Sequence, residues 1–149
     1  MSMNLILWRH ADAEDGIPDD KRRLTAKGRK QAQKMADWLE RHLPAGWRVM
    51  ASPAARTCET AAALTADFAI ARALSTSATP QGLLKAAGWP DGEGTVVVVG
   101  HQPTLGAAAG LALTGSEQPW NVKKGAIWWI TRDDNDDITV RAVLAPGIL

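Results

Sequence analysis

The stretch Leu5-Ile6-Leu7-Trp8-Arg9-His10-Ala11 decides how the rest of the chain is organised. Its four apolar residues form a run of the length of a buried β-strand, and an arginine and a histidine follow directly. In open α/β sheets, functional sites form where the strands end at their carboxyl edge. His10 is therefore a candidate nucleophile and Arg9 a candidate anion-binding residue. The alternative for these residues alone is a strand end with two solvated polar side chains.

The composition indicates a folded protein with little net charge. A length of 149 residues, 46% of them hydrophobic, predicts one domain over residues 1–149 with a substantial core. A net charge of +1 argues against a nucleic-acid partner. The single cysteine, Cys58, excludes an intramolecular disulfide and suits a reducing compartment. No signal peptide and no apolar run of transmembrane length is recognised, so we expect a cytoplasmic protein without a membrane partner. We also expect a monomer.

Strand and helix patterns alternate along the first two thirds of the chain. Residues 48–51 and 96–99 are strand candidates, and the four valines of the second suit a parallel strand buried on both faces. Thr25 is the candidate N-cap of a long helix. Further helices are predicted to begin at Ser52-Pro53, over residues 80–87 and at Pro103, with a short strand near residues 71–74.

The last part of the chain has strand patterns without a helix pattern between them. Residues 126–131 and 138–144 have strand composition, and the polar run between them predicts a β-hairpin. Strand–helix alternation followed by a hairpin predicts a three-layer α/β/α sandwich, with a mostly parallel sheet and a C-terminal antiparallel β-hairpin.

Histidine, arginine or serine side chains follow each of three predicted strands. Arg9-His10 follows the first, Ser52-Pro53 with Arg56 follows the second, and Gly100-His101 follows the valine strand. If these strands are parallel, two histidines and two arginines converge at one edge of the sheet. The arginines can then neutralise phosphoryl oxygens, while one histidine attacks phosphorus and the other donates a hydrogen bond.

These motifs, in this order, resemble the histidine phosphatase superfamily, and the short chain is similar to its SixA-type protein-histidine phosphatases. The resemblance rests on Arg9-His10, Leu24-Thr25-x-x-Gly28, Ser52-Pro53-x-x-Arg56-x-x-x-Thr60 and Gly100-His101. It implies a phosphoglycerate mutase-like fold and His10 as the nucleophile that becomes phosphohistidine. It also implies His101 as a second catalytic residue, phosphoryl binding by Arg9, Arg56 and His101, and no metal or other cofactor. Arg22 matches a further basic position of the SixA-like pattern.

The sequence departs from the family pattern in two places. The usual Arg-His-Gly is Arg9-His10-Ala11 here, and an alanine is strained if position 11 needs a positive φ. Many members carry a catalytic carboxylate after the third strand, but residues 71–90 contain none. Asp12, Glu14 or Asp15 in the first loop remain candidates for a general acid.

The missing carboxylate favours one class of substrate. An alkoxide leaving group needs a proton in the transition state, whereas an imidazole can carry one on its remaining ring nitrogen near neutral pH. We therefore expect hydrolysis of phosphohistidine on a phosphorylated protein, for which a histidine phosphotransfer domain is a candidate. The alternatives are a small-molecule phosphomonoesterase and a low-turnover phosphohistidine-binding regulatory module.

Overall fold

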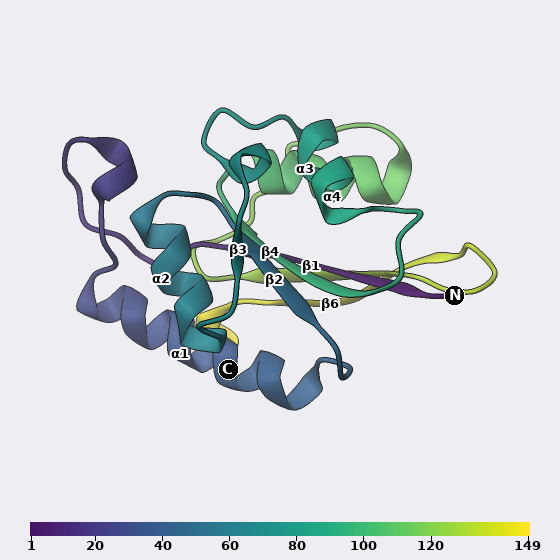
Figure 1. Cartoon of the computed structure of the whole chain (residues 1–149), viewed down its shortest axis with the longest axis horizontal. Helices are drawn as coiled ribbons and strands as arrows, with labels where there is room; N and C mark the ends of the chain where they lie inside the picture. Colours follow the sequence, from purple (N-terminus) through teal and green to yellow (C-terminus); the bar gives the residue numbers. More distant parts are fainter.

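A six-stranded mixed sheet forms the centre of the molecule (Figure 1). The computed structural model describes residues 1–149. The strand order is β3-β2-β4-β1-β5-β6; the first four strands are parallel, and β5 and β6 are antiparallel to their neighbours. In chain order the strands are β1 (Met3–Arg9), β2 (Arg48–Ala51), β3 (Ala69–Ile70), β4 (Gly94–Gly100), β5 (Ile127–Arg132) and β6 (Ile138–Leu144). The predicted fold class, including the C-terminal hairpin, is confirmed.

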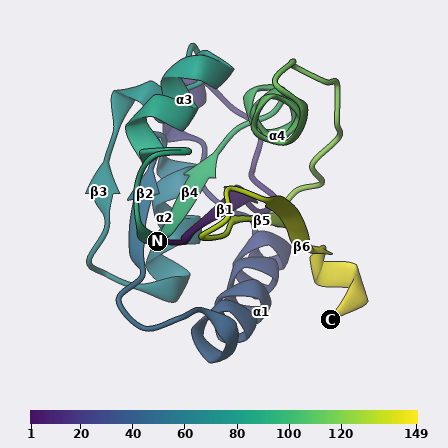
Figure 2. The same cartoon turned by 90° about the vertical axis from the view of Figure 1, so that its right-hand side faces the viewer.

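The four α-helices cover the two faces of the sheet, as Figure 2 shows. One face carries α1 (Ala26–His42) and α2 (Ala55–Leu64), and the other carries α3 (Pro80–Ala87) and α4 (Thr104–Thr114). Three 3₁₀ turns, η1 (Asp19–Lys21), η2 (Arg72–Leu74) and η3 (Pro146–Ile148), lie in the connections. None of the helices has the length and apolar character that crossing a membrane requires.

The alternation of side chains along β1 and β4 divides the core into two layers. Leu5 and Leu7 pack with the α3 and α4 side, whereas Ile6 and Trp8 pack with the α1 and α2 side, and all four are fully buried. The valines of β4 alternate in the same way. Because both faces are covered by helices, these strands have continuous apolar sequences, as parallel strands do.

The predicted helix start at Ser52-Pro53 is wrong by two to three residues. The helix begins at Ala55, and Ala54 occupies the N-cap position without a side-chain cap. The Ser52 hydroxyl instead accepts a hydrogen bond from the backbone N–H of Ala54 at 3.2 Å and contacts a histidine at the sheet edge. Ser52 thus belongs to the strand end rather than to the helix.

The strand predicted near residues 71–74 is also displaced. The sheet contains only Ala69 and Ile70 of this region, paired with Met50 and Ala51, and residues 72–74 form the turn η2. Leu74 is buried at 1% exposure, so the apolar character of this segment reflects packing of the turn under α3 and α4 rather than a strand.

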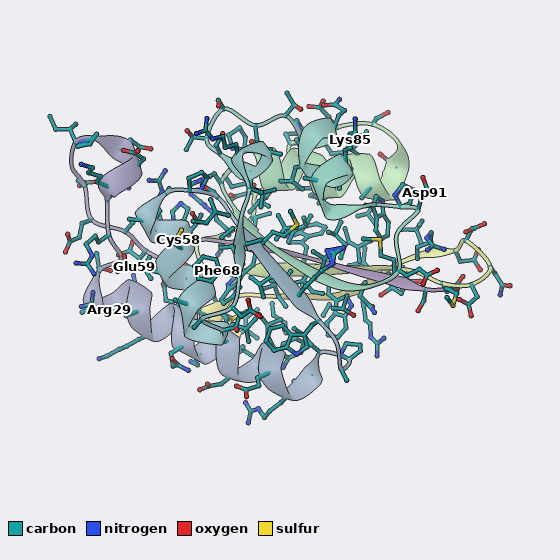
Figure 3. The ribbon with its side chains drawn as sticks, viewed as in Figure 1. Arg29, Cys58, Glu59, Phe68, Lys85 and Asp91 are labelled. Carbon is teal, nitrogen blue, oxygen red and sulfur yellow. The ribbon has the colours of Figure 1, made fainter.

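The polar loop between β1 and α1 is fastened at both of its ends. Thr25 caps α1 as predicted, accepting from the Gly28 N–H at 2.9 Å, and its own hydroxyl donates to the Asp12 carboxylate at 2.8 Å. Glu59 lies on α2, on the side of the first loop (Figure 3). It accepts from the backbone N–H of Leu24 at 2.9 Å and pairs with Arg23 at 3.1 Å. The loop is therefore held against both helices of one layer.

Replacing Gly28 by alanine should destabilise the protein. A Cβ at this position would lie 1.9 Å from the carbonyl oxygen of Asp12, a backbone atom that cannot move independently. Alanine improves intrinsic helix propensity by ~1 kcal/mol, but overpacking of this kind costs ~1–3 kcal/mol or more. We expect urea denaturation to show a lower free energy of unfolding. Gly147→Ala, where a Cβ meets nothing within 4 Å, is the control; equal stability of the two variants would contradict the interpretation.

Candidate active site

The register of three parallel strands determines where the polar strand ends meet. Arg9 of β1 lies opposite Gly100 of β4, and Ala51 of β2 lies opposite Val99. The ladder continues one residue further, because the His10 N–H donates to the Gly100 carbonyl at 3.2 Å and the Ser52 N–H donates to the Val99 carbonyl at 3.1 Å. The residues that follow these strands therefore leave the sheet side by side.

His10 is buried, with its ring held in one tautomer. Its Nδ1 lies 2.7 Å from the Ala11 carbonyl oxygen, which can only accept, so Nδ1 carries the proton. The lone pair is then on Nε2, the atom available for attack. Burial lowers the pKa of His10 to about 4, opposed by the Ala11 hydrogen bond and assisted by the positive charges of Arg56, Arg9 and Arg22. His10 is thus a neutral imidazole at physiological pH.

His101 faces His10 across the site. The two ring centroids are 5.5 Å apart, and both side chains are more than nine-tenths buried. Nε2 of His101 lies 2.8 Å from the Ser52 hydroxyl, and Nδ1 lies 3.4 Å from a guanidinium nitrogen of Arg56, which can only donate. Burial, reinforced by the charge of Arg56, lowers the pKa of His101 to about 3. The uncharged form therefore has its proton on Nε2 and its lone pair toward Arg56.

Arg9 and Arg56 each keep one buried donor without an acceptor. Arg9 donates from Nη1 to the Val122 carbonyl at 2.9 Å, and Arg56 is 4% exposed in the first turn of α2. The Nε–H groups of both side chains are buried and have no hydrogen-bond partner in the protein. Buried unpaired donors are costly, and the charges of both arginines act on both neutral imidazoles, so this edge of the sheet fits an anionic ligand.

The loop between β1 and α1 brings two further charged residues to this edge. Arg22 is near enough to His10 to contribute to its lowered pKa, and it pairs with Asp19 at 3.0 Å. The Asp19 carboxylate also pairs with Arg56 at 3.0 Å, and the Asp19 carbonyl accepts from Arg56 at 2.8 Å. The sequence analysis named Arg22 but missed Asp19. The only local signal for Asp19 was its place two residues before a basic run. Its contact with Arg56 on α2 is long-range, and neighbouring residues do not predict it.

The loop carboxylates named as candidate acids lie in different surroundings. Both oxygens of Asp12 are engaged, one by Thr25 at 2.8 Å and the other by Lys124 at 3.1 Å. These hydrogen bonds lower the pKa of Asp12, so it stays ionised at neutral pH. Glu14 and Asp15 are exposed, and their carboxylates make no hydrogen bond or ion pair.

Two other positions raised by the sequence have structural explanations. Ala11 does not adopt a positive φ, and its side chain packs with Leu24 and Ala32, so alanine is unstrained there. Cys58 is half-buried, and its thiol donates to the Ser52 carbonyl at 3.3 Å. Burial raises the pKa of Cys58, which makes it a poor nucleophile. No group of three or more His, Cys, Asp or Glu side chains could hold a metal ion.

Comparisons with known proteins agree with the resemblance seen in the sequence. The model of the histidine phosphatase superfamily (branch 1) matches residues 5–76. The protein histidine phosphatase SixA in complex with tungstate is 26% identical, covering 98% of this chain and 99% of that one, with a TM-score of 0.79. A protein of Nakamurella multipartitia assigned as the phosphohistidine phosphatase SixA is also 26% identical, covering 98% of this chain and 97% of its own, with a TM-score of 0.78.

A more distant solved structure shares the fold alone. A phosphoserine phosphatase variant of Entamoeba histolytica in complex with phosphoserine is 16% identical, with a TM-score of 0.72 and coverage of 99% of each chain. No curated protein matches the chain by sequence.

The lowered pKa values of the two histidines predict how stability depends on pH. An unfolded chain protonates its histidines near pH 6.5, whereas the native chain does so near pH 4 and pH 3. The unfolded state therefore binds more protons as the pH falls from 6.5 to 4. Each histidine should reduce the free energy of unfolding by up to ~1.4 kcal/mol per pH unit in this window.

Urea denaturation between pH 7 and pH 4.5 measures this slope. We expect His101→Asn to flatten it, whatever the stability of that variant at pH 7, because one of the two linked protons is removed. An unchanged slope would contradict the assignment of His101 as a neutral buried group.

Proposed function

From the match to the histidine phosphatase superfamily model and the similarity to SixA, we propose that this chain is a phosphatase of that superfamily, which removes phosphate from phosphohistidine on a protein through a covalent intermediate on His10. The observation that carries the proposal is a neutral His10, with Nε2 free of the proton, on which the charges of Arg56 and Arg9 act, while each of these arginines keeps a buried Nε–H donor without a partner. Phosphoryl oxygens accept such donors, and a neutral imidazole attacks phosphorus. The similar SixA structure was solved with tungstate, a tetrahedral oxyanion.

The first step forms one phosphorus–nitrogen bond and breaks another. Nε2 of His10 attacks the phosphoryl group in line, while the guanidinium groups of Arg9 and Arg56 bind its oxygens. His101 acts beside them, because a bound dianion favours protonation of its Nδ1, which then donates to the phosphoryl group. The substrate imidazole takes a proton from solvent on its other ring nitrogen and leaves as the neutral ring, with the electron pair of the broken bond on the nitrogen that held phosphorus. The Ala11 carbonyl keeps the His10 ring oriented.

The second step returns the enzyme to its starting state. Water attacks phosphorus of phospho-His10, the bond to Nε2 breaks, and inorganic phosphate leaves. The same donors that bind the phosphoryl oxygens in the first step serve the second, because the charge develops on the same atoms. One water is consumed and one phosphate released for each phosphohistidine.

The chemistry of the leaving group supports phosphohistidine over a phosphate ester. An ester needs a general acid, yet the carboxylate nearest the arginines, Asp19, is bound by two guanidinium groups, and these hydrogen bonds lower its pKa. Asp19 is therefore ionised at neutral pH and holds no proton to donate. A phosphohistidine leaving group accepts a proton at its own ring nitrogen and does not depend on such an acid.

Replacing His10 by alanine should abolish turnover. We expect release of phosphate from a histidine-phosphorylated protein to fall by at least about a thousandfold, because the nucleophile is lost. Hydrolysis of p-nitrophenyl phosphate, measured in parallel, should be slow in the wild type. His42→Ala, which changes an exposed histidine on α1, is the matched control and should keep full activity.

Three outcomes of this assay would reject the proposal. Wild-type activity in His10→Ala would exclude the nucleophile. Efficient ester hydrolysis without preference for phosphohistidine would favour a small-molecule phosphomonoesterase. Binding of the phosphoprotein without release or a radiolabelled enzyme intermediate would favour a regulatory binding module.

The pH dependence of kcat/KM gives an independent check. Attack requires neutral His10, whose pKa is about 4, so the acid limb should lie near pH 4, after correction for ionisation of the substrate. The rate should therefore change little between pH 7 and pH 5.5. A corrected limb near pH 6.5 would show that the attacking group is not a buried, depressed imidazole.

A further inference from the structure

Asp19 makes a set of contacts that joins the first loop to the proposed phosphoryl-binding arginines. It begins η1, where its side chain is 57% exposed. One carboxylate oxygen binds Nη2 of Arg56 at 3.0 Å, and the other binds Nη1 of Arg22 at 3.0 Å. Its carbonyl oxygen binds Nη1 of Arg56 at 2.8 Å. A single residue thus holds guanidinium groups that come from α2 and from the loop.

These contacts leave specific donors free on each arginine. Asp19 takes the Nη1–Nη2 edge of Arg56, which leaves the buried Nε–H unpaired. Arg22 donates from Nε to the Glu14 carbonyl at 2.7 Å and from Nη1 to Asp19, and its Nη2 has no partner in the protein. A ligand that accepts from both arginines would therefore use donors whose directions Asp19 determines.

The charge balance of the site also indicates that Asp19 holds the arginines together. Arg9, Arg22 and Arg56 are three like charges around two neutral imidazoles, and like charges held together repel. The Asp19 carboxylate lies between two of them and leaves two net positive charges, the number that a phosphoryl dianion neutralises. Arg22, on an otherwise exposed loop, has no other side-chain partner to keep it at the site.

We propose that Asp19 is the positioning residue of the phosphoryl site, which couples Arg22 to Arg56 so that both guanidinium groups bind the phosphoryl group in one fixed geometry. This inference rests on the proposed function, since it concerns the same site. Asp19 acts through the two arginines and does not transfer a proton. Loss of its carboxylate leaves Arg22 held only by the Glu14 carbonyl and Arg56 held only by the Asp19 carbonyl and His101. Displacement of binding groups by about 1 Å can reduce rates about a hundredfold.

Asp19→Asn tests the inference with little change of shape. We expect kcat/KM on a histidine-phosphorylated protein to fall about 10- to 100-fold, with binding of orthovanadate, measured by calorimetry, weakened in parallel. Asp19→Glu, which keeps the carboxylate, should recover part of the loss. Asp20→Asn is the matched control, because Asp20 is exposed in the same turn and its side chain makes no ion pair; it should behave as the wild type.

A double-mutant cycle separates positioning from a general structural effect. In an Arg22→Ala background, Asp19→Asn should lower kcat/KM by much less than it does in the wild type, because the arginine that it positions is already gone. Thermal unfolding of each variant verifies that the fold is intact. Full additivity of the two substitutions would overturn the proposed coupling.

Two further results would overturn the inference. Asp19→Asn could match Asp20→Asn in every assay, or it could bind orthovanadate more tightly than the wild type, which would make Asp19 a competitor of the substrate anion. Failure of the proposed function looks different. In that case the wild type itself would not release phosphate from phosphohistidine, while orthovanadate binding would still report whether Asp19 organises the anion site.

Discussion

The hydrogen-bond register between β2, β4 and β1 is the constraint on which the rest of the structure depends. Arg9 opposite Gly100 and Ala51 opposite Val99 bring the two histidines and Ser52 out of the sheet together. The same register sends alternate side chains to the two helical layers. Because a slip of one residue would exchange the faces of a strand, the apolar layers hold the register, and the register assembles the site. The same strand register is therefore needed both for a stable core and for the geometry of the site.

Burial gives the same edge of the sheet the features that suit an anionic ligand. Two imidazoles are held neutral by desolvation, and two arginine Nε–H groups are buried without acceptors. Each of these features costs stability, because the native state resists protonation and leaves donors unpaired. Such costs are typical of functional sites, where the local environment is matched to a ligand rather than to the empty fold. The surrounding layers of apolar side chains supply the stability that permits this arrangement.

Local patterns predicted most of the fold, because they depend on neighbours in the chain. Thr25 as an N-cap, the helix over residues 80–87 and the valine strand follow from short-range rules, and all appear in the structure. Ser52 was misread as a cap because its hydroxyl is used by His101, 49 residues away. The role of Asp19 was missed for a similar reason, since its partner Arg56 is on another element and the only local signal was a carboxylate before a basic run. Convergence of the strand ends and a site role for Arg22 in the first loop were predictable, but the contacts of Asp19 with Arg56 were not.

The state of Asp19 connects the geometry of the site to the choice of substrate. A carboxylate that is to act as a general acid must hold a proton near neutral pH, which requires burial away from positive charge. Asp19 is in the opposite environment, exposed on one side and paired with two guanidinium groups on the other. It is therefore suited to hold arginines in place and unsuited to protonate an alkoxide. This environment is the basis of the proposed preference for a leaving group that carries its own proton, which the imidazole of phosphohistidine can do.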